Sequence, residues 1–95
     1  MSAKRLEFSA RAIANMEAIK AHISSDNMAA ANRVIAGILS TAGELADFPM
    51  MGHPGEIAGI RELSLSKYPY TLIYRLTAEK VLIAAVVHQS MKHRS

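Results

Sequence analysis

Residues 61–75 read Arg-Glu-Leu-Ser-Leu-Ser-Lys-Tyr-Pro-Tyr-Thr-Leu-Ile-Tyr-Arg and contain all three tyrosines of the chain. Leucine and serine alternate over residues 63–66, which is the two-residue period of a strand with one buried face. Lys67-Tyr68-Pro69 interrupts this pattern and predicts a turn, because proline lacks the N–H that a sheet ladder needs. In the second alternation one face carries Tyr70, Leu72, Tyr74 and Leu76, and the other carries Thr71, Ile73, Arg75 and Thr77. The stretch therefore predicts two adjacent strands, with the tyrosine face of the second turned toward the core.

Two helices are predicted before this stretch. Residues 10–24 and 28–46 carry apolar side chains at three- and four-residue steps, the period of a helix with one buried stripe. Ser9 is a good N-cap for the first helix, and Asp26 or Asn27 for the second. Gly37 and Gly43 lie inside the second helix, where each costs about 0.5–1 kcal/mol relative to alanine. We expect a close approach to the first helix to compensate, so that the two helices form a hairpin.

The strand pattern completes an α+β fold. Lys4 to Phe8 predicts a short first strand, Phe48-Pro49 ends the second helix, and residues 50–59 predict a loop. Three strands follow, at about 60–66, 70–77 and 80–88. Because their connections are short, we expect a consecutive antiparallel meander. The predicted order is β-α-α-β-β-β, with the helical hairpin packed on one face of an antiparallel sheet.

Length, charge and composition limit the class of protein. A chain of 95 residues that is 51% hydrophobic predicts one domain over residues 1–95. The chain has no cysteine, its N-terminus lacks the apolar core of a signal peptide, and its longest apolar run, 81–87, is too short to span a bilayer. These features predict a cytoplasmic protein without a membrane partner. Residues 1–50 carry five basic and five acidic side chains, whereas residues 51–95 carry six and three. The sheet half therefore holds the net charge of +3, which favours an acidic or polyanionic partner.

Several short segments recur in a known order. They are Gly59-Ile60-Arg61-Glu62-Leu63, Tyr68-Pro69-Tyr70, Ile73-Tyr74-Arg75 and Val87-His88, preceded by Leu45, Pro49, Gly52 and Gly55. Together they resemble RelE/ParE-superfamily toxins, the toxin components of type II toxin–antitoxin modules, sometimes called plasmid stabilisation systems. The resemblance implies the same β-α-α-β-β-β fold and a growth-inhibiting activity. It also implies a cognate antitoxin protein encoded nearby, with which the toxin forms a hetero-oligomer.

The resemblance leaves the target open between two kinds. Members of the superfamily either inhibit DNA gyrase or cleave mRNA on the ribosome. The pattern Arg-Glu-Leu…Tyr-Pro-Tyr…Tyr-Arg is closer to the ParE branch, and the only lysines of the sheet region, Lys67 and Lys80, lie at strand ends. We therefore expect a ParE-like inhibitor of DNA gyrase, which is not an enzyme. The alternatives are a RelE-like ribosome-dependent mRNA endoribonuclease and a degenerate, non-toxic relative.

The candidate site residues differ between these functions. RNA cleavage needs groups that move protons and a cation that stabilises the charged phosphate, for which arginine is suited. By position, the resemblance gives a ribonuclease the catalytic set Arg61, Arg75 and His88. For target binding it gives Arg61, Arg75, Tyr70, Tyr74 and Arg94. We expect Arg75 on the open face of the sheet, near Arg61 and His88. The ordinary alternatives are surface ion pairs for the arginines, core packing for the tyrosines and a backbone partner for His88.

No cofactor or metal is expected. Gly52-His53-Pro54-Gly55-Glu56 has neither the spacing nor the lysine of a phosphate-binding loop. His88 and His93 lie five residues apart at the end of a strand, which does not resemble a zinc site.

Overall fold

The two helices begin at the caps that the sequence provides. The computed structural model describes residues 3–92 of the chain, with the side chains of residues 3–90. Helix α1 (Ala10–Ser24) starts after Ser9, whose extended backbone lets its Oγ accept a hydrogen bond from the Ala12 N–H at 3.0 Å. Helix α2 (Met28–Asp47) starts after Asn27, whose Oδ1 accepts from the Ala30 N–H at 3.0 Å. Both predicted helices are confirmed, and Asn27 rather than Asp26 is the second cap.

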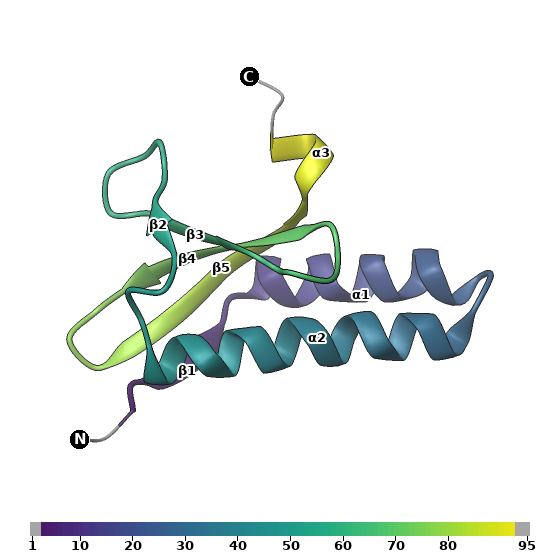
Figure 1. Cartoon of the computed structure of the whole chain (residues 1–95), viewed down its shortest axis with the longest axis horizontal. Helices are drawn as coiled ribbons and strands as arrows, with labels where there is room; N and C mark the ends of the chain where they lie inside the picture. The colour runs from purple at the N-terminus through teal and green to yellow at the C-terminus, as the bar shows by residue number, and fades with distance from the viewer. Residues whose placement is uncertain (1–2, 93–95) are drawn as a thin grey trace.

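The sheet has five strands in the order β1-β5-β4-β3-β2. The strands are β1 (Arg5–Phe8), β2 (His53–Pro54), β3 (Arg61–Ser64), β4 (Tyr70–Leu76) and β5 (Lys80–His88). The antiparallel meander β3-β4-β5 is confirmed. However, β1 pairs with β5 in parallel, so the sheet is mixed rather than antiparallel throughout. Parallel pairing needs a long connection, and here the helical hairpin and the three strands β2, β3 and β4 supply it (Figure 1).

Two short elements were not predicted. Strand β2 forms inside the expected loop, where His53 and Pro54 pair with Glu62 and Arg61 of β3. Its proline is tolerated because β2 is the last strand at this edge of the sheet. Helix α3 (Gln89–Lys92) follows β5 directly. Helix α3 and the loop that follows β2 both extend away from the helical hairpin (Figure 1).

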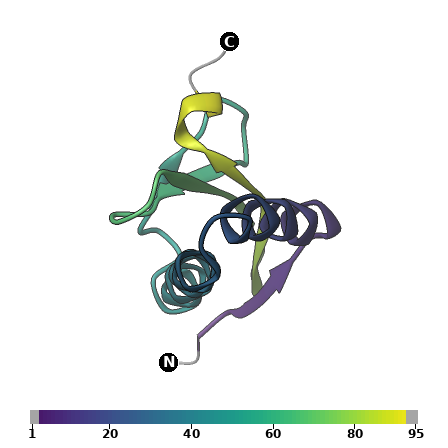
Figure 2. The ribbon, with the colours of Figure 1, turned by 90° about the vertical axis from the view of Figure 1, so that its right-hand side faces the viewer.

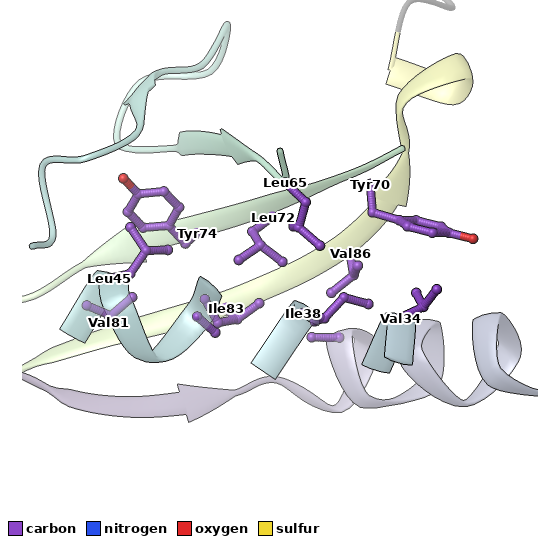
Figure 3. Packing of buried hydrophobic residues seen from close by; sticks show 12 residues of the cluster. Val34, Ile38, Leu45, Leu65, Tyr70, Leu72, Tyr74, Val81, Ile83 and Val86 are labelled. Atoms are coloured by element: carbon purple, nitrogen blue, oxygen red, sulfur yellow. The ribbon is translucent and has the colours of Figure 1, made fainter. Parts of the chain in front are cut away.

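Both long helices cover the same face of the sheet, as the end-on view shows (Figure 2). The core between the helices and the sheet draws on α2, β4 and β5 (Figure 3), and its largest fully buried side chains are those of Tyr74, Ile38, Leu45, Leu72, Ile83 and Val81. Tyr70, Leu72 and Tyr74 are all buried, so the predicted inward face of β4 is confirmed. Arg75 is exposed on the opposite face, as predicted.

A β-bulge in β5 fixes α1 to the sheet. Ile73 pairs with Ala85 whereas Tyr74 pairs with Ile83, which leaves Ala84 as the extra residue. The Ser9 Oγ donates a hydrogen bond to the Ala84 carbonyl at 2.8 Å, and the Asn15 Oδ1 accepts one from the Val86 N–H at 3.0 Å. Polar groups of β5 beyond its pairing with β1 are thus satisfied by the N-cap and the second turn of α1.

The glycines of α2 do not serve helix–helix packing. A Cβ on Gly37 would lie 2.8 Å from the Tyr68 ring, which belongs to the β3–β4 connection. A Cβ on Gly43 would meet nothing within 4 Å. The prediction that both glycines allow close approach to the first helix was therefore wrong. Gly37 leaves space for the Tyr68 ring of the β3–β4 connection, whereas Gly43 has no neighbouring atom that a Cβ would contact.

Candidate functional site

Tyr74 is the centre of a hydrogen-bonded cluster rather than an exposed contact residue. Its side chain is fully buried, and its register partner on β3 is Arg61. The hydroxyl accepts from the Gly52 N–H at 3.1 Å and from the Arg61 Nε at 3.3 Å, and it donates to the Pro49 carbonyl at 3.0 Å. A buried hydroxyl that makes three such bonds ties the connection between α2 and β3 to the centre of the sheet.

The Arg61 side chain completes this cluster. Its Nη2 donates to the Gly52 carbonyl at 2.7 Å and to the Met50 carbonyl at 3.4 Å. Because Arg61 pairs directly with Tyr74, its side chain lies on the helix-facing side of the sheet. The prediction that Arg61 shares the open face with Arg75 was therefore wrong. Its half-buried guanidinium is engaged with backbone carbonyls of its own chain.

Arg75 lies on a basic part of the open face. It pairs with Leu82 of β5, and Leu82 pairs with Glu7 of β1, so these three side chains form one row across the sheet. The Lys80 Nζ lies 3.2 Å from Glu7 and the Arg5 Nη2 lies 3.8 Å from it. We call Arg5, Lys80 and Arg75, with the carboxylate of Glu7, the outer basic face. Within residues 3–92 Arg75 takes part in no ion pair, so its charge is available to a partner.

His88 is at the other end of β4 from Arg61. It pairs with Tyr70, and the two rings meet edge to face with centroids 5.3 Å apart. The His88 Nδ1 accepts a hydrogen bond from the Ser90 N–H at 3.0 Å, with the Ser90 Oγ at 2.8 Å, so the imidazole caps the start of α3. Tyr70 is buried with only 8% of its surface exposed. Both residues thus have local structural partners.

The predicted catalytic set does not converge. Arg61 and His88 flank positions of β4 that are four residues apart, or about 13 Å along a strand. Arg75 projects from the opposite face. Arg94, the remaining predicted contact residue, lies outside the described residues. Among residues 3–92 no three His, Asp or Glu side chains come together in a group that could hold a metal ion.

A second candidate site is an apolar groove on the outside of the helical hairpin, and none of its residues was among the predicted site residues. Its floor is Ile13 and Met16 of α1 with Ile35 and Leu39 of α2, and Glu17 and Lys20 line its edge. The groove holds about 200 Å³, and Ile13 and Leu39 each keep 46% of their surface exposed. The adjacent pairs Val34-Ile35 and Ile38-Leu39 contained the signal, because they widen the apolar stripe of α2 so that its edge extends beyond the surface the sheet covers.

Comparison with known proteins identifies the family. Residues 6–93 match the family model for the ParE toxin of the type II toxin–antitoxin system parDE. The chain belongs to the ParE toxin family. As a ParE-family protein it is also 40% identical, over 88 residues, to the candidate toxin Y4kP of Sinorhizobium fredii. That alignment covers 93% of this chain and 91% of Y4kP.

Solved structures share the fold of this ParE-family chain. A chain of the chromosomal ParDE toxin–antitoxin system from P. aeruginosa superimposes with a TM-score of 0.81 at 22% identity, covering 90% of this chain and 95% of that one. A chain of the RelBE2 toxin–antitoxin complex from Mycobacterium tuberculosis superimposes with a TM-score of 0.69 at 23% identity, covering 90% and 98%. The α+β fold of two helices on a mixed sheet is therefore that of ParDE and RelBE toxins. Within residues 3–92, no helix has the length and apolar character needed to cross a membrane.

Proposed function

We propose that this ParE-family toxin stops growth by inhibiting DNA gyrase and cleaves no RNA. The observation that carries the proposal is the dispersal of Arg61, Arg75 and His88 over two faces and two ends of the sheet. General acid–base catalysis needs its groups within hydrogen-bond reach of one substrate, directly or through one water. An inhibitor that acts by binding has no such requirement. The match to the ParE family model also supports this choice.

Arg75 and the outer basic face would supply electrostatic contact with the target. On the open face the cations Arg5, Lys80 and Arg75 outnumber the carboxylates Glu7 and Glu62, which gives a local charge of +1. Such a face attracts an acidic protein surface and accelerates association. Arg61 would act indirectly, because its hydrogen bonds hold the connection between α2 and β3.

Supercoiling and cleavage assays test the target. We expect the purified toxin to inhibit gyrase supercoiling, and primer extension on cellular mRNA to show no early breaks after induction. Growth should stop when the chain is produced alone and recover when the neighbouring reading frame is produced with it. Codon-position-specific mRNA breaks within minutes, with gyrase untouched, would instead support the ribonuclease. Unimpaired growth with the soluble protein alone would support a non-toxic relative.

The antitoxin partner fits the groove on the helical hairpin. The groove is apolar at its floor and carries one acidic and one basic residue at its edge, which suits an amphipathic helix. An antitoxin segment that is disordered alone could fold into this groove and continue over the sheet. The two superimposed structures come from a ParDE system and from a RelBE2 toxin–antitoxin complex.

A substitution in the groove should weaken the antitoxin without touching the toxin's action. We expect Leu39→Ser to raise the Kd for the neighbouring gene's protein by about tenfold or more, since a central interface residue contributes over about 1.4 kcal/mol. Isothermal titration calorimetry measures it. The control is Met28→Ser, because Met28 is 57% exposed but does not line the groove. Equal affinities for both variants would place the antitoxin elsewhere.

A further inference from the structure

A cluster of exposed apolar side chains follows α2 directly. Phe48 and Met50 each expose 66% of their surface, and Met51 exposes 43%. We call residues 48–52 the apolar loop. Its sequence is Phe-Pro-Met-Met-Gly and contains no charged or hydrogen-bonding side chain. Exposed apolar side chains that gather in one place mark interaction sites more often than singly scattered ones do.

The backbone of the apolar loop is held on every residue. The Phe48 N–H donates to the Glu44 carbonyl at 2.8 Å, and the Met51 N–H donates to the Phe48 carbonyl at 3.0 Å. The Pro49 carbonyl and the Gly52 N–H bind the Tyr74 hydroxyl, and the Met50 and Gly52 carbonyls bind Arg61. The side chains are thus presented from a fixed backbone, which lowers the ordering cost of binding.

We infer that the apolar loop is the surface that inserts into an apolar pocket of the target protein. The inference rests on the proposed function, in which the target is a protein. Nucleic acid is a poor occupant, because its affinity depends on cations that neutralise phosphates, and the nearest arginine, Arg61, is turned inward onto backbone carbonyls. Phenylalanine and methionine are among the residues enriched at protein interfaces. The antitoxin, a segment that folds on binding, has the concave groove between α1 and α2 available to it.

The loop also accounts for the cluster beneath it. The five-residue apolar loop is held by the buried hydroxyl of Tyr74 and the guanidinium of Arg61. Gly52 allows the loop to lie directly against Tyr74. This support distinguishes the apolar loop from most surface connections, which are usually variable and mobile. Arg61 and Tyr74 are thereby positioning residues of the target contact.

The test uses the full chain with serine at two exposed positions, Phe48→Ser/Met50→Ser. We expect the concentration for half-inhibition of gyrase supercoiling to rise at least about tenfold, with the thermal unfolding midpoint and the Kd for the antitoxin unchanged. Met50→Ser alone should give a smaller rise, and it remains available if the double variant unfolds. The control is Ile57→Ser, which replaces a side chain that is 70% exposed on the β2–β3 connection, outside the apolar loop. Its inhibition should equal that of the wild type.

Three results would overturn the inference. Undiminished inhibition by the folded double variant would remove the loop from the target contact. Loss of antitoxin binding instead would make the loop part of the antitoxin site. A change of oligomeric state in light scattering, with inhibition intact, would make it a contact between copies of this chain.

If the wild type arrests growth but leaves gyrase active, the proposed function fails by itself. Growth after induction of the double variant then tests whether the apolar loop contacts the target. Retained growth arrest would contradict the inference, and loss of growth arrest would support it.

Discussion

Gly52→Ala is expected to lower the free energy of unfolding by about 2–4 kcal/mol, because overpacking costs about 1–3 kcal/mol and a lost hydrogen bond adds about 1 kcal/mol. A Cβ at this position would lie 2.5 Å from the Tyr74 hydroxyl and against the Glu62 carbonyl. Neither atom can give way easily. The hydroxyl is held by Gly52, Arg61 and Pro49, and the carbonyl belongs to a paired strand of the sheet. Urea denaturation followed by circular dichroism measures the change.

Gly43→Ala is the matched control, since it adds the same methyl group. A Cβ on Gly43 meets nothing within 4 Å, and the residue lies inside α2. Alanine there should raise the free energy of unfolding by about 0.5–1 kcal/mol, through its better helix propensity. The two substitutions should therefore change stability in opposite directions. If Gly52→Ala proved as well tolerated as Gly43→Ala, the close packing of the apolar loop on Tyr74 would be wrong.

Much of the fold could be predicted because its signals are local. Ser9 and Asn27 each accept a hydrogen bond from an N–H three residues on, so a cap is visible within one turn of sequence. The alternation from Tyr70 to Leu76 requires only that one face of a strand be buried. For that reason the inward tyrosines and the outward Arg75 were placed correctly.

The features that were missed depend on contacts between distant parts of the chain. The parallel pairing of β1 with β5 joins residues more than seventy positions apart, such as Leu6 and Val81. The bulge at Ala84 is set by side chains of Ser9 and Asn15, which no local pattern in β5 reveals. In the sequence, Tyr74 looks like an ordinary core tyrosine. Only the folded connection between α2 and β3 shows that its hydroxyl binds Pro49, Gly52 and Arg61.

Arg61 is different, because the sequence did contain its signal. Arg61, Leu63 and Leu65 lie two positions apart along the strand and so share a face, and Leu65 is buried. The alternation alone therefore placed Arg61 on the inward face, away from Arg75. The expectation of an arginine pair on the open face gave the resemblance more weight than the strand period. The two-residue period shows which side chains share a face of a strand. Only the register of β3 with β4 shows that Arg61 lies beside Tyr74.

Arg75→Ala is expected to abolish toxicity while leaving the protein folded. The side chain is exposed and takes part in no ion pair within residues 3–92, so its loss should change stability by less than about 0.5 kcal/mol. A charge-assisted contact with the target is worth about 1.5–3 kcal/mol, which corresponds to about a ten- to hundredfold loss of affinity. Arg75→Lys should restore little if the contact is bidentate, because lysine lacks the planar fork of arginine. Growth after induction, supercoiling inhibition and thermal unfolding measure the three effects.

Two comparisons separate a contact role from a structural one. Arg33→Ala removes an equally exposed cation from α2 and should leave toxicity unchanged, which controls for net charge. Arg61→Ala should reduce toxicity together with stability, because it leaves the Gly52 and Met50 carbonyls without their donor. If Arg75→Ala is folded and fully toxic, Arg75 is only a surface charge. If Arg75→Ala unfolds, the arginine supports the sheet, and the outer basic face loses its free cation. An electrostatic contact with the target predicts two results together: the folded Arg75→Ala protein loses inhibition while Arg33→Ala keeps it, and inhibition by the wild type weakens as salt is raised.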